Sequence, residues 1–139
     1  MRGSELAKIL IVEDNALNVK LFCDLLAAHG HEPRPVTDGR FALDQAREFG
    51  PDLVITDIQL PHVTGLDLIR FIREDEKLKD VPIMAVTAYS ARGDEERIRA
   101  AGAQAYVSKP ISVAKFVAKV NELLGIENAS EKAPAQQAT

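Results

Sequence analysis

Five short apolar runs alternate with longer stretches of helical character along this chain, and that alternation constrains the fold more than any other feature. The runs are residues 9–12, 35–36, 53–56, 83–86 and 105–108. Two of them are nearly continuous in Ile, Leu and Val, which is typical of strands covered on both faces. Strands that alternate with helices predict an α/β fold with a parallel sheet, right-handed crossovers and helices on both faces.

The second run is the weakest of the five. It contains Pro35 and follows Pro33, and proline cannot donate a hydrogen bond to a neighbouring strand. We therefore expect an edge strand here.

The helical stretches have recognisable boundaries. In the last, apolar residues recur at positions 113, 116, 117, 120, 123 and 124, the spacing of one helix face. Ser112 can cap its start and Gly125 lies where it should end. Asp38 heads the second helix. The fourth, residues 92–101, has Ile98 as its only large apolar residue, which predicts a loosely held helix.

The 139 residues fit one domain, which we expect at residues 8–125 between a flexible segment, 1–7, and a disordered tail, 126–139. So short a tail predicts no attached output module. The net charge of −4 argues against nucleic acid binding, and no apolar run approaches the ~20 residues of a membrane span. The absence of a secretory signal and the single cysteine, Cys23, favour the cytoplasm.

Polar residues with matching chemistry follow the central runs. Glu13 and Asp14 come after the first run, Asp57 after the third, Thr87 after the fourth and Lys109 after the fifth. Ligands of open parallel sheets bind beyond the carboxyl ends of the strands, so these side chains should meet at one edge. Each alone has an ordinary explanation as a helix cap, a strand residue or a surface lysine. Capping does not require all five at the same edge.

The set fits phosphoryl transfer. Oxygen ligands alone favour a hard cation such as Mg²⁺. A carboxylate can attack phosphorus to form an aspartyl phosphate, and a lysine and a hydroxyl can stabilise the phosphoryl oxygens. Asp57 is therefore the candidate acceptor.

These residues resemble the receiver domains of bacterial response regulators. The resemblance covers about residues 8–124, and residues 12–22, 56–65 and 87–94 are most similar to single-domain receivers of the DivK type. Its motifs are Ile9-Leu10-Ile11-Val12-Glu13-Asp14-Asn15, the stretch from Asp57 through Pro61 to Gly65, Thr87-Ala88, and Lys109-Pro110. It implies a flavodoxin-like (βα)5 fold whose five-stranded parallel sheet has the order 2-1-3-4-5.

The resemblance also implies roles. Asp57 matches the phosphorylated aspartate. Asp14 and Asp57 match direct ligands of Mg²⁺ or Mn²⁺, with the backbone carbonyl of Gln59 as a third and Glu13 acting through water.

Thr87 and Lys109 match the pair that contacts the phosphoryl group, and Tyr106 matches the aromatic switch residue that turns inward when Thr87 moves. The Lys109-Pro110 bond would be cis. Gln59 and Tyr89 flank the site at positions that tune phosphoaspartate hydrolysis, and the bulk of Tyr89 predicts slow hydrolysis.

Such a domain is a phospho-acceptor in signalling rather than an enzyme, and it assists only its own phosphorylation and dephosphorylation. The donor would be a sensor histidine kinase or a histidine phosphotransfer protein. The readout would be contact between a downstream protein and the face formed by the fourth helix, fifth strand and fifth helix. The resemblance implies no nucleic acid and no membrane insertion.

Three other functions fit less well. A flavodoxin-like cofactor-binding protein needs Gly, Ser or Thr after the first strand, where Glu13 and Asp14 stand. A phosphatase with an aspartate nucleophile needs a second acid two residues later, where Gln59 cannot titrate. A degenerate receiver that signals without phosphate would not need the complete set of site residues.

Overall fold

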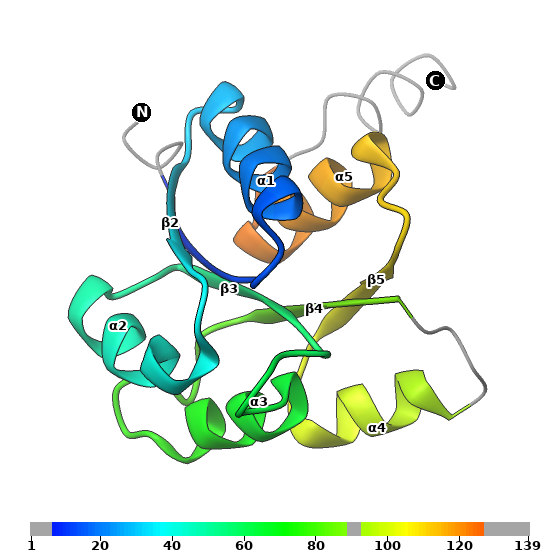
Figure 1. Ribbon diagram of the computed structural model, residues 1–139. Helices are drawn as coiled ribbons and strands as arrows, with labels where there is room; N and C mark the ends of the chain where they lie inside the picture. Colours follow the sequence, from blue (N-terminus) through cyan, green and yellow to red (C-terminus); the bar gives the residue numbers. More distant parts are fainter. Residues whose placement is uncertain (1–6, 89–92, 127–139) are drawn as a thin grey trace, which may run out of the picture.

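The computed structural model describes residues 7–88 and 93–126, which form a five-stranded parallel sheet with helices on both sides (Figure 1). The strand order is β2-β1-β3-β4-β5, which confirms the predicted fold class and sheet order. The elements in chain order are β1 (Lys8–Val12), α1 (Ala16–Ala28), β2 (Glu32–Val36), the 3-10 helix η2 (Gly39–Phe41), α2 (Ala42–Phe49), β3 (Leu53–Asp57), α3 (Gly65–Glu74), β4 (Ile83–Thr87), α4 (Asp94–Ala101), β5 (Ala105–Ser108) and α5 (Val113–Leu124).

Two apolar cores flank the sheet, one beneath α1 and α5 and the other beneath α2, α3 and α4 (Figure 1). Side chains of a strand point alternately to opposite faces. In β1, Leu10 and Val12 therefore pack on the side of α2, α3 and α4, whereas Ile9 and Ile11 pack on the side of α1 and α5. Both faces are covered, and this is why the central strands are apolar at most positions.

β2 lies at the edge of the sheet, where its only described partner strand is β1. It is longer than the run at residues 35–36 predicts, because pairing begins at Lys8 opposite Glu32. An edge position tolerates Pro33 and Pro35, since the outer side of the strand needs no donors. Tertiary pairing thus extends a strand whose own composition is unfavourable.

The helix caps agree with the sequence in most places. Asn15 Oδ1 accepts from the N–H of Asn18 at the start of α1, and Ser112 caps α5 in the same way. Gly125 ends α5 in the left-handed conformation that glycine adopts without strain. Asp38 caps the short η2 rather than α2 itself. Val113, part of the predicted apolar face, is 49% exposed.

Some predictions concern residues outside the described ranges. These are the flexible segment, apart from the buried Ala7, and the tail beyond Ile126. Tyr89 and the first residue of the predicted fourth helix, Arg92, also lie outside them, and α4 begins at Asp94. No helix within the described residues is both long and apolar enough to cross a membrane.

Candidate functional site

The candidate site lies at the carboxyl edge of the three central strands and β5. Glu13 and Asp14 directly follow β1, and Lys109 directly follows β5. Asp57 and Thr87 are the last residues of β3 and β4, respectively, so each of these strands ends one residue later than predicted. Because all four strands are parallel, their carboxyl ends lie together, and the five predicted side chains come from neighbouring strand ends.

Three carboxylates converge at this edge. One carboxylate oxygen from each of Glu13, Asp14 and Asp57 lies within 4.8 Å of the others. Glu13 and Asp57 are buried, at 1% and 5% exposure, whereas Asp14 is exposed. Like charges this close repel one another when they are deprived of water, so the cluster calls for a positive partner.

Lys109 supplies one positive charge. Its Nζ lies 3.0 Å from Asp57 Oδ2 and 3.5 Å from Glu13 Oε1. Burial opposes the charged form of Lys109, but the hydrogen bond to Asp57 and the charges of Asp57 and Glu13 outweigh burial and raise its pKa. Lys109 is therefore held as a cation beside Asp57. The Lys109-Pro110 bond is cis, the isomer that the resemblance implies.

One ammonium does not balance three carboxylates. Glu13 Oε1 is buried and has no hydrogen-bond partner in the described structure, although Lys109 lies nearby. Burial raises the pKa of Glu13, and the negative charge of Asp57 adds to the effect, while the backbone N–H of Asn15 opposes it. An orphaned buried carboxylate oxygen beside two further carboxylates fits a hard divalent cation, which prefers oxygen ligands. The residues present therefore suit Mg²⁺ or Mn²⁺.

The loop after β3 fixes the orientation of Asp57. The N–H of Gln59 donates to Asp57 Oδ1 at 3.1 Å, and the N–H of Gly65 donates to the carbonyl of Ile58 at 2.8 Å. The second bond brings the start of α3 against the end of β3. A Cβ at Gly65 would lie 2.2 Å from the carbonyl oxygen of Asp57, so only glycine fits there.

Composition and spacing did not predict two further contacts at the site, those of Asn15 and Gly65. Asn15 caps α1 with its side chain, and its N–H donates to Glu13 Oε2 at 3.1 Å. Gly65 appears in the sequence as part of a motif, but its function depends on the close approach of two backbones. The signals available in the sequence are the Asn that follows two acidic residues and the Gly that begins an apolar helix.

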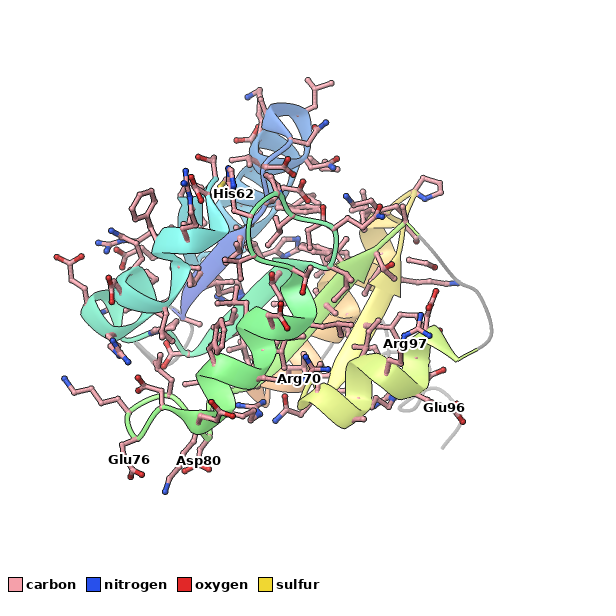
Figure 2. The ribbon with its side chains drawn as sticks, turned by 60° about the horizontal axis from the view of Figure 1, so that its bottom comes forward. His62, Arg70, Glu76, Asp80, Glu96 and Arg97 are labelled. Atoms are coloured by element: carbon pink, nitrogen blue, oxygen red, sulfur yellow. The ribbon has the colours of Figure 1, made fainter. Side chains whose placement is uncertain are left out.

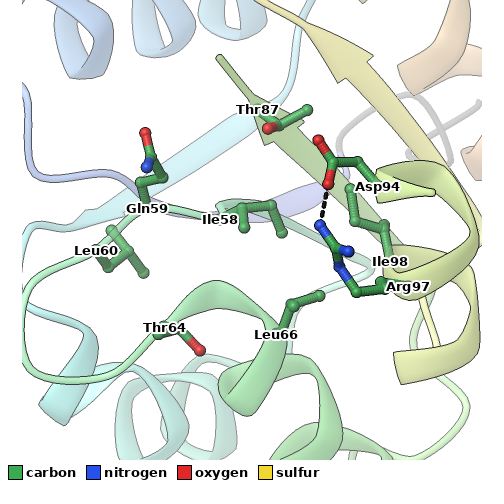
Figure 3. A pocket seen from close by; sticks show the side chains of 9 residues that line it. All are labelled: Ile58, Gln59, Leu60, Thr64, Leu66, Thr87, Asp94, Arg97 and Ile98. Atoms are coloured by element: carbon green, nitrogen blue, oxygen red, sulfur yellow. Dashed lines mark hydrogen bonds and ion pairs between the residues drawn. The ribbon is translucent and has the colours of Figure 1, made fainter. Parts of the chain in front are cut away.

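Thr87 and Tyr106 lie on the side of the sheet that α4 covers. Thr87 is 2% exposed and lines a pocket of about 580 Å³ between the loop after β3, α3 and α4 (Figure 3). Tyr106 is half-buried, packs against the core on this side and also lines a separate groove beside α4 and α5. The two residues therefore belong to adjacent strands and face the same helix, α4.

Comparison with known proteins gives a consistent result. The family model described as response regulator receiver domain matches residues 9–121. The polar-differentiation response regulator DivK of Brucella ovis is 51% identical over 117 residues, which cover 84% of this chain and 95% of the relative. DivK of Brucella anthropi is 50% identical over the same length and with the same coverage.

Solved structures show the same architecture. The receiver domain of a Pseudomonas aeruginosa sensor histidine kinase, solved with magnesium coordinated in its active site cleft, superposes with a TM-score of 0.80 at 32% identity. The match covers 86% of this chain and 98% of that one. The chemotaxis protein CheY4 of Vibrio cholerae superposes with a TM-score of 0.81 at 25% identity and covers 85% of this chain and 98% of its own.

Proposed function

The chain belongs to the family of response regulator receiver domains, and from that premise we propose that it accepts a phosphoryl group on Asp57. The donor would be a phosphohistidine on a sensor histidine kinase or a histidine phosphotransfer protein in the cytoplasm. The observation that supports this most is the buried Asp57 carboxylate, which contacts Lys109 at 3.0 Å within a cluster of three carboxylates.

In this reaction one Asp57 oxygen attacks phosphorus. The new O–P bond forms as the P–N bond of the phosphohistidine breaks, and the electron pair and a proton remain on the leaving imidazole. The Gln59 N–H and Lys109 Nζ hold the carboxylate in one orientation, which reduces the entropic cost of the transfer. Lys109 and the Thr87 hydroxyl would then contact the phosphoryl oxygens and stabilise their charge.

The carboxylate cluster would hold Mg²⁺, or Mn²⁺ in its place. Asp14, Asp57 and the backbone carbonyl of Gln59 would be direct ligands, and Glu13 would act through water. When bound, the ion would neutralise the carboxylates and the equatorial oxygens of the phosphoryl group, which otherwise repel one another. The orphaned Glu13 Oε1 supports this assignment, because it is buried without a hydrogen-bond partner in the described structure, although Lys109 lies 3.5 Å away.

Signalling would follow through Thr87 and Tyr106. Contact between Thr87 and the phosphoryl group favours an inward position of Tyr106, and this biases a pre-existing equilibrium of α4. The groove beside α4, β5 and α5, which Tyr106 lines, is the face proposed for a downstream protein. In this proposal the domain is a signalling component and turns over no substrate other than its own phosphoaspartate.

Phosphorylation with acetyl phosphate and MgCl₂, followed by a phosphate-affinity gel, tests the acceptor. We expect a shifted band for the wild type and none for Asp57→Asn. A matched control is Asp80→Asn, since Asp80 is exposed and lies far from His62 in the loop after β3 (Figure 2). Its band should shift as in the wild type.

The remaining outcomes of this experiment would each contradict a different part of the proposal. A shift that survives Asp57→Asn would overturn the site assignment. Folded wild-type protein that never shifts, with acetyl phosphate or with a phosphorylated histidine phosphotransfer protein, would favour a degenerate receiver. Sustained release of phosphate from a phosphomonoester, beyond one equivalent per chain, would favour a phosphatase.

A further inference from the structure

α4 is held unequally along its length. Its two buried residues, Ile98 and Ala101, both lie in its second half. The first turn, from Asp94 to Arg97, contains no buried residue, and its N-cap, Gly93, offers no side chain to cap the helix. Burial of apolar side chains is the main stabilising contribution to a surface helix, so the second half is attached more firmly than the first.

A single arginine adds to this asymmetry. Arg73, in α3, donates from Nε to the carbonyl of Gly102 at 2.9 Å, directly after α4. Its Nη1 donates to the carbonyls of Lys79 and Val81 at 2.9 and 2.8 Å, and its Nη2 donates to Gln104 Oε1 at 2.8 Å. We refer to Arg73, Gln104 and these three carbonyls as the Arg73 clasp. It joins α3, the segment before β4 and the segment after α4.

The Arg73 clasp is also bonded to the sheet. Gln104 Oε1 accepts from the N–H of Ile83 at 2.8 Å, and the N–H of Gln104 donates to the Ile83 carbonyl at 3.0 Å. Gly102 has a φ of 127°, and a Cβ there would lie 2.6 Å from Arg73 Cγ. The glycine thus permits both the turn after α4 and the close contact with Arg73. The C-terminal end of α4 is therefore fixed to β4.

The other end of α4 adjoins open space. The pocket of about 580 Å³ separates Asp94, Arg97 and Ile98 of α4 from Leu66 of α3 and from the loop after β3 (Figure 3). Arg97 is bonded to Asp94 within the same helical turn, not to α3 (Figure 3). α3 and α4 lie side by side, with Arg70 and Arg97 on the same face of the molecule (Figure 2).

We propose that the Arg73 clasp is a pivot, about which the N-terminal turn of α4 moves over the pocket when Asp57 is phosphorylated, while the C-terminal end stays in place. This inference rests on the proposed function and specifies its regulation. A helix is stiff along its axis. Because one end of α4 is fixed and the other adjoins open space, a small displacement at Thr87 should rotate α4 about its fixed end. Arg73 is a positioning residue in this device and does not contact the phosphoryl group.

Amide chemical shifts and hydrogen exchange of the full chain, with and without beryllofluoride and MgCl₂, test the pivot residue by residue. In the wild type we expect beryllofluoride to shift the amides of Asp94–Arg97 strongly, while Gly102 and Gln104 keep their exchange rates. In Arg73→Lys, which keeps the charge but loses most of the hydrogen bonds, the amides of Gly102 and Gln104 should exchange on the order of tenfold faster. The beryllofluoride-induced shifts should then extend through residues 98–101.

Arg70→Lys is the matched control, because Arg70 lies one turn earlier in α3, is exposed and has only Asp67 as its described hydrogen-bond partner. It should behave as the wild type does. A merely structural Arg73 would lower stability without changing where beryllofluoride acts along α4. If Arg73→Lys does not fold, Gln104→Ala removes the Nη2 contact, together with the bond from the Ile83 N–H, keeps the other Arg73 contacts and should widen the response in the same direction.

The outcomes separate the two proposals. Equal shifts at both ends of α4 in the wild type, or an unchanged pattern in Arg73→Lys, would overturn the pivot but leave the acceptor role intact. An amide of Gln59 that does not respond to beryllofluoride would instead overturn the acceptor role, and the pivot with it.

Discussion

Gly65 is the first residue of α3, and a Cβ there would stand 2.2 Å from the carbonyl oxygen of Asp57. At Gly39 a Cβ would lie 3.3 Å from the carbonyl oxygen of Val63, a contact that a small shift relieves. Both glycines lie near the loop after β3, but only one of them is pressed against the candidate acceptor. The pair therefore separates the effect of added volume from the effect of displacing Asp57.

Gly65→Ala should destabilise the protein by about 1–3 kcal/mol, because the added methyl group forces two backbones apart. It should also slow phosphorylation by acetyl phosphate, since Asp57 moves relative to Lys109. Gly39→Ala should have a smaller effect on both. Urea unfolding and timed phosphate-affinity gels measure the two quantities. Equal effects of the two substitutions would contradict the close approach at Gly65.

His31 is a titratable residue outside the site, at the turn into β2. It is 7% exposed, and its Nδ1 accepts from the N–H of Ala7 at 3.4 Å. Burial, with a smaller contribution from the charge of His29, lowers the pKa of His31 below 6.5. The folded state therefore prefers neutral His31, and the unfolded state binds more protons in this range.

The stability that neutral His31 contributes should be complete above pH 6.5 and lost as the pH falls through its lower folded-state pKa. The thermal midpoint of the wild type should thus fall more between about pH 7.5 and 5.5 than that of His31→Gln. His62→Asn, which removes an exposed histidine, serves as the control and should follow the wild type. Parallel pH curves for the wild type and His31→Gln would refute the assignment.

At the scale of elements, α1 and α5 are joined through one aromatic pair. The rings of Phe22 and Phe116 stack with centroids 5.0 Å apart and planes inclined by 14°. Both side chains are almost fully buried in the core on the side of α1 and α5. The two helices flank the segments that deliver Asp14 and Lys109, so their packing also supports the site.

A double-mutant cycle with Phe22→Leu and Phe116→Leu should give a coupling energy of about 0.5–1.5 kcal/mol in urea unfolding. The reason is that stacked rings interact beyond the area they bury. Phe49 lies in the core on the opposite side of the sheet, so Phe22→Leu and Phe49→Leu should be additive. Additivity in both cycles would mean that the stacking contributes nothing.

At the scale of the whole molecule, the carboxylate cluster should link stability to divalent cations. It consists of Glu13, Asp14 and Asp57, which come from two different strand ends and exist as a cluster only in the folded chain. A ligand that binds only the folded state stabilises it by mass action. Asp14 is the exposed member, so replacing it disturbs the core least.

MgCl₂ should raise the thermal midpoint, and a hundredfold excess over the dissociation constant corresponds to about 2.7 kcal/mol of stabilisation. NaCl at matched ionic strength should not reproduce the effect. Asp14→Asn should lose most of the Mg²⁺-dependent gain while it keeps the fold, which circular dichroism can verify. An equal gain in Asp14→Asn and the wild type would show that the ion binds elsewhere.

The alternation of apolar runs with helical stretches was sufficient to predict the parallel sheet and its two helical layers, because strands buried on both faces require that pattern. The strand ends likewise predicted the five residues of the candidate site, since parallel strands bring their carboxyl ends to one edge. The prediction was weaker at β2, which starts at Glu32 instead of Pro35, because backbone pairing with β1 outweighs the proline content.

Short-range signals in the sequence thus determined the helices and strands and the residues of the candidate site. These signals are the apolar periods, the caps and the residue types after each strand. The tertiary structure alone decided the distances on which chemistry depends, such as the 3.0 Å between Lys109 and Asp57. It also brings Gly65 against the carbonyl of Asp57, where only glycine fits, and places Arg73 where it fixes one end of α4. These contacts join residues far apart in the chain, and their geometry exists only once the sheet has aligned the segments that bear them.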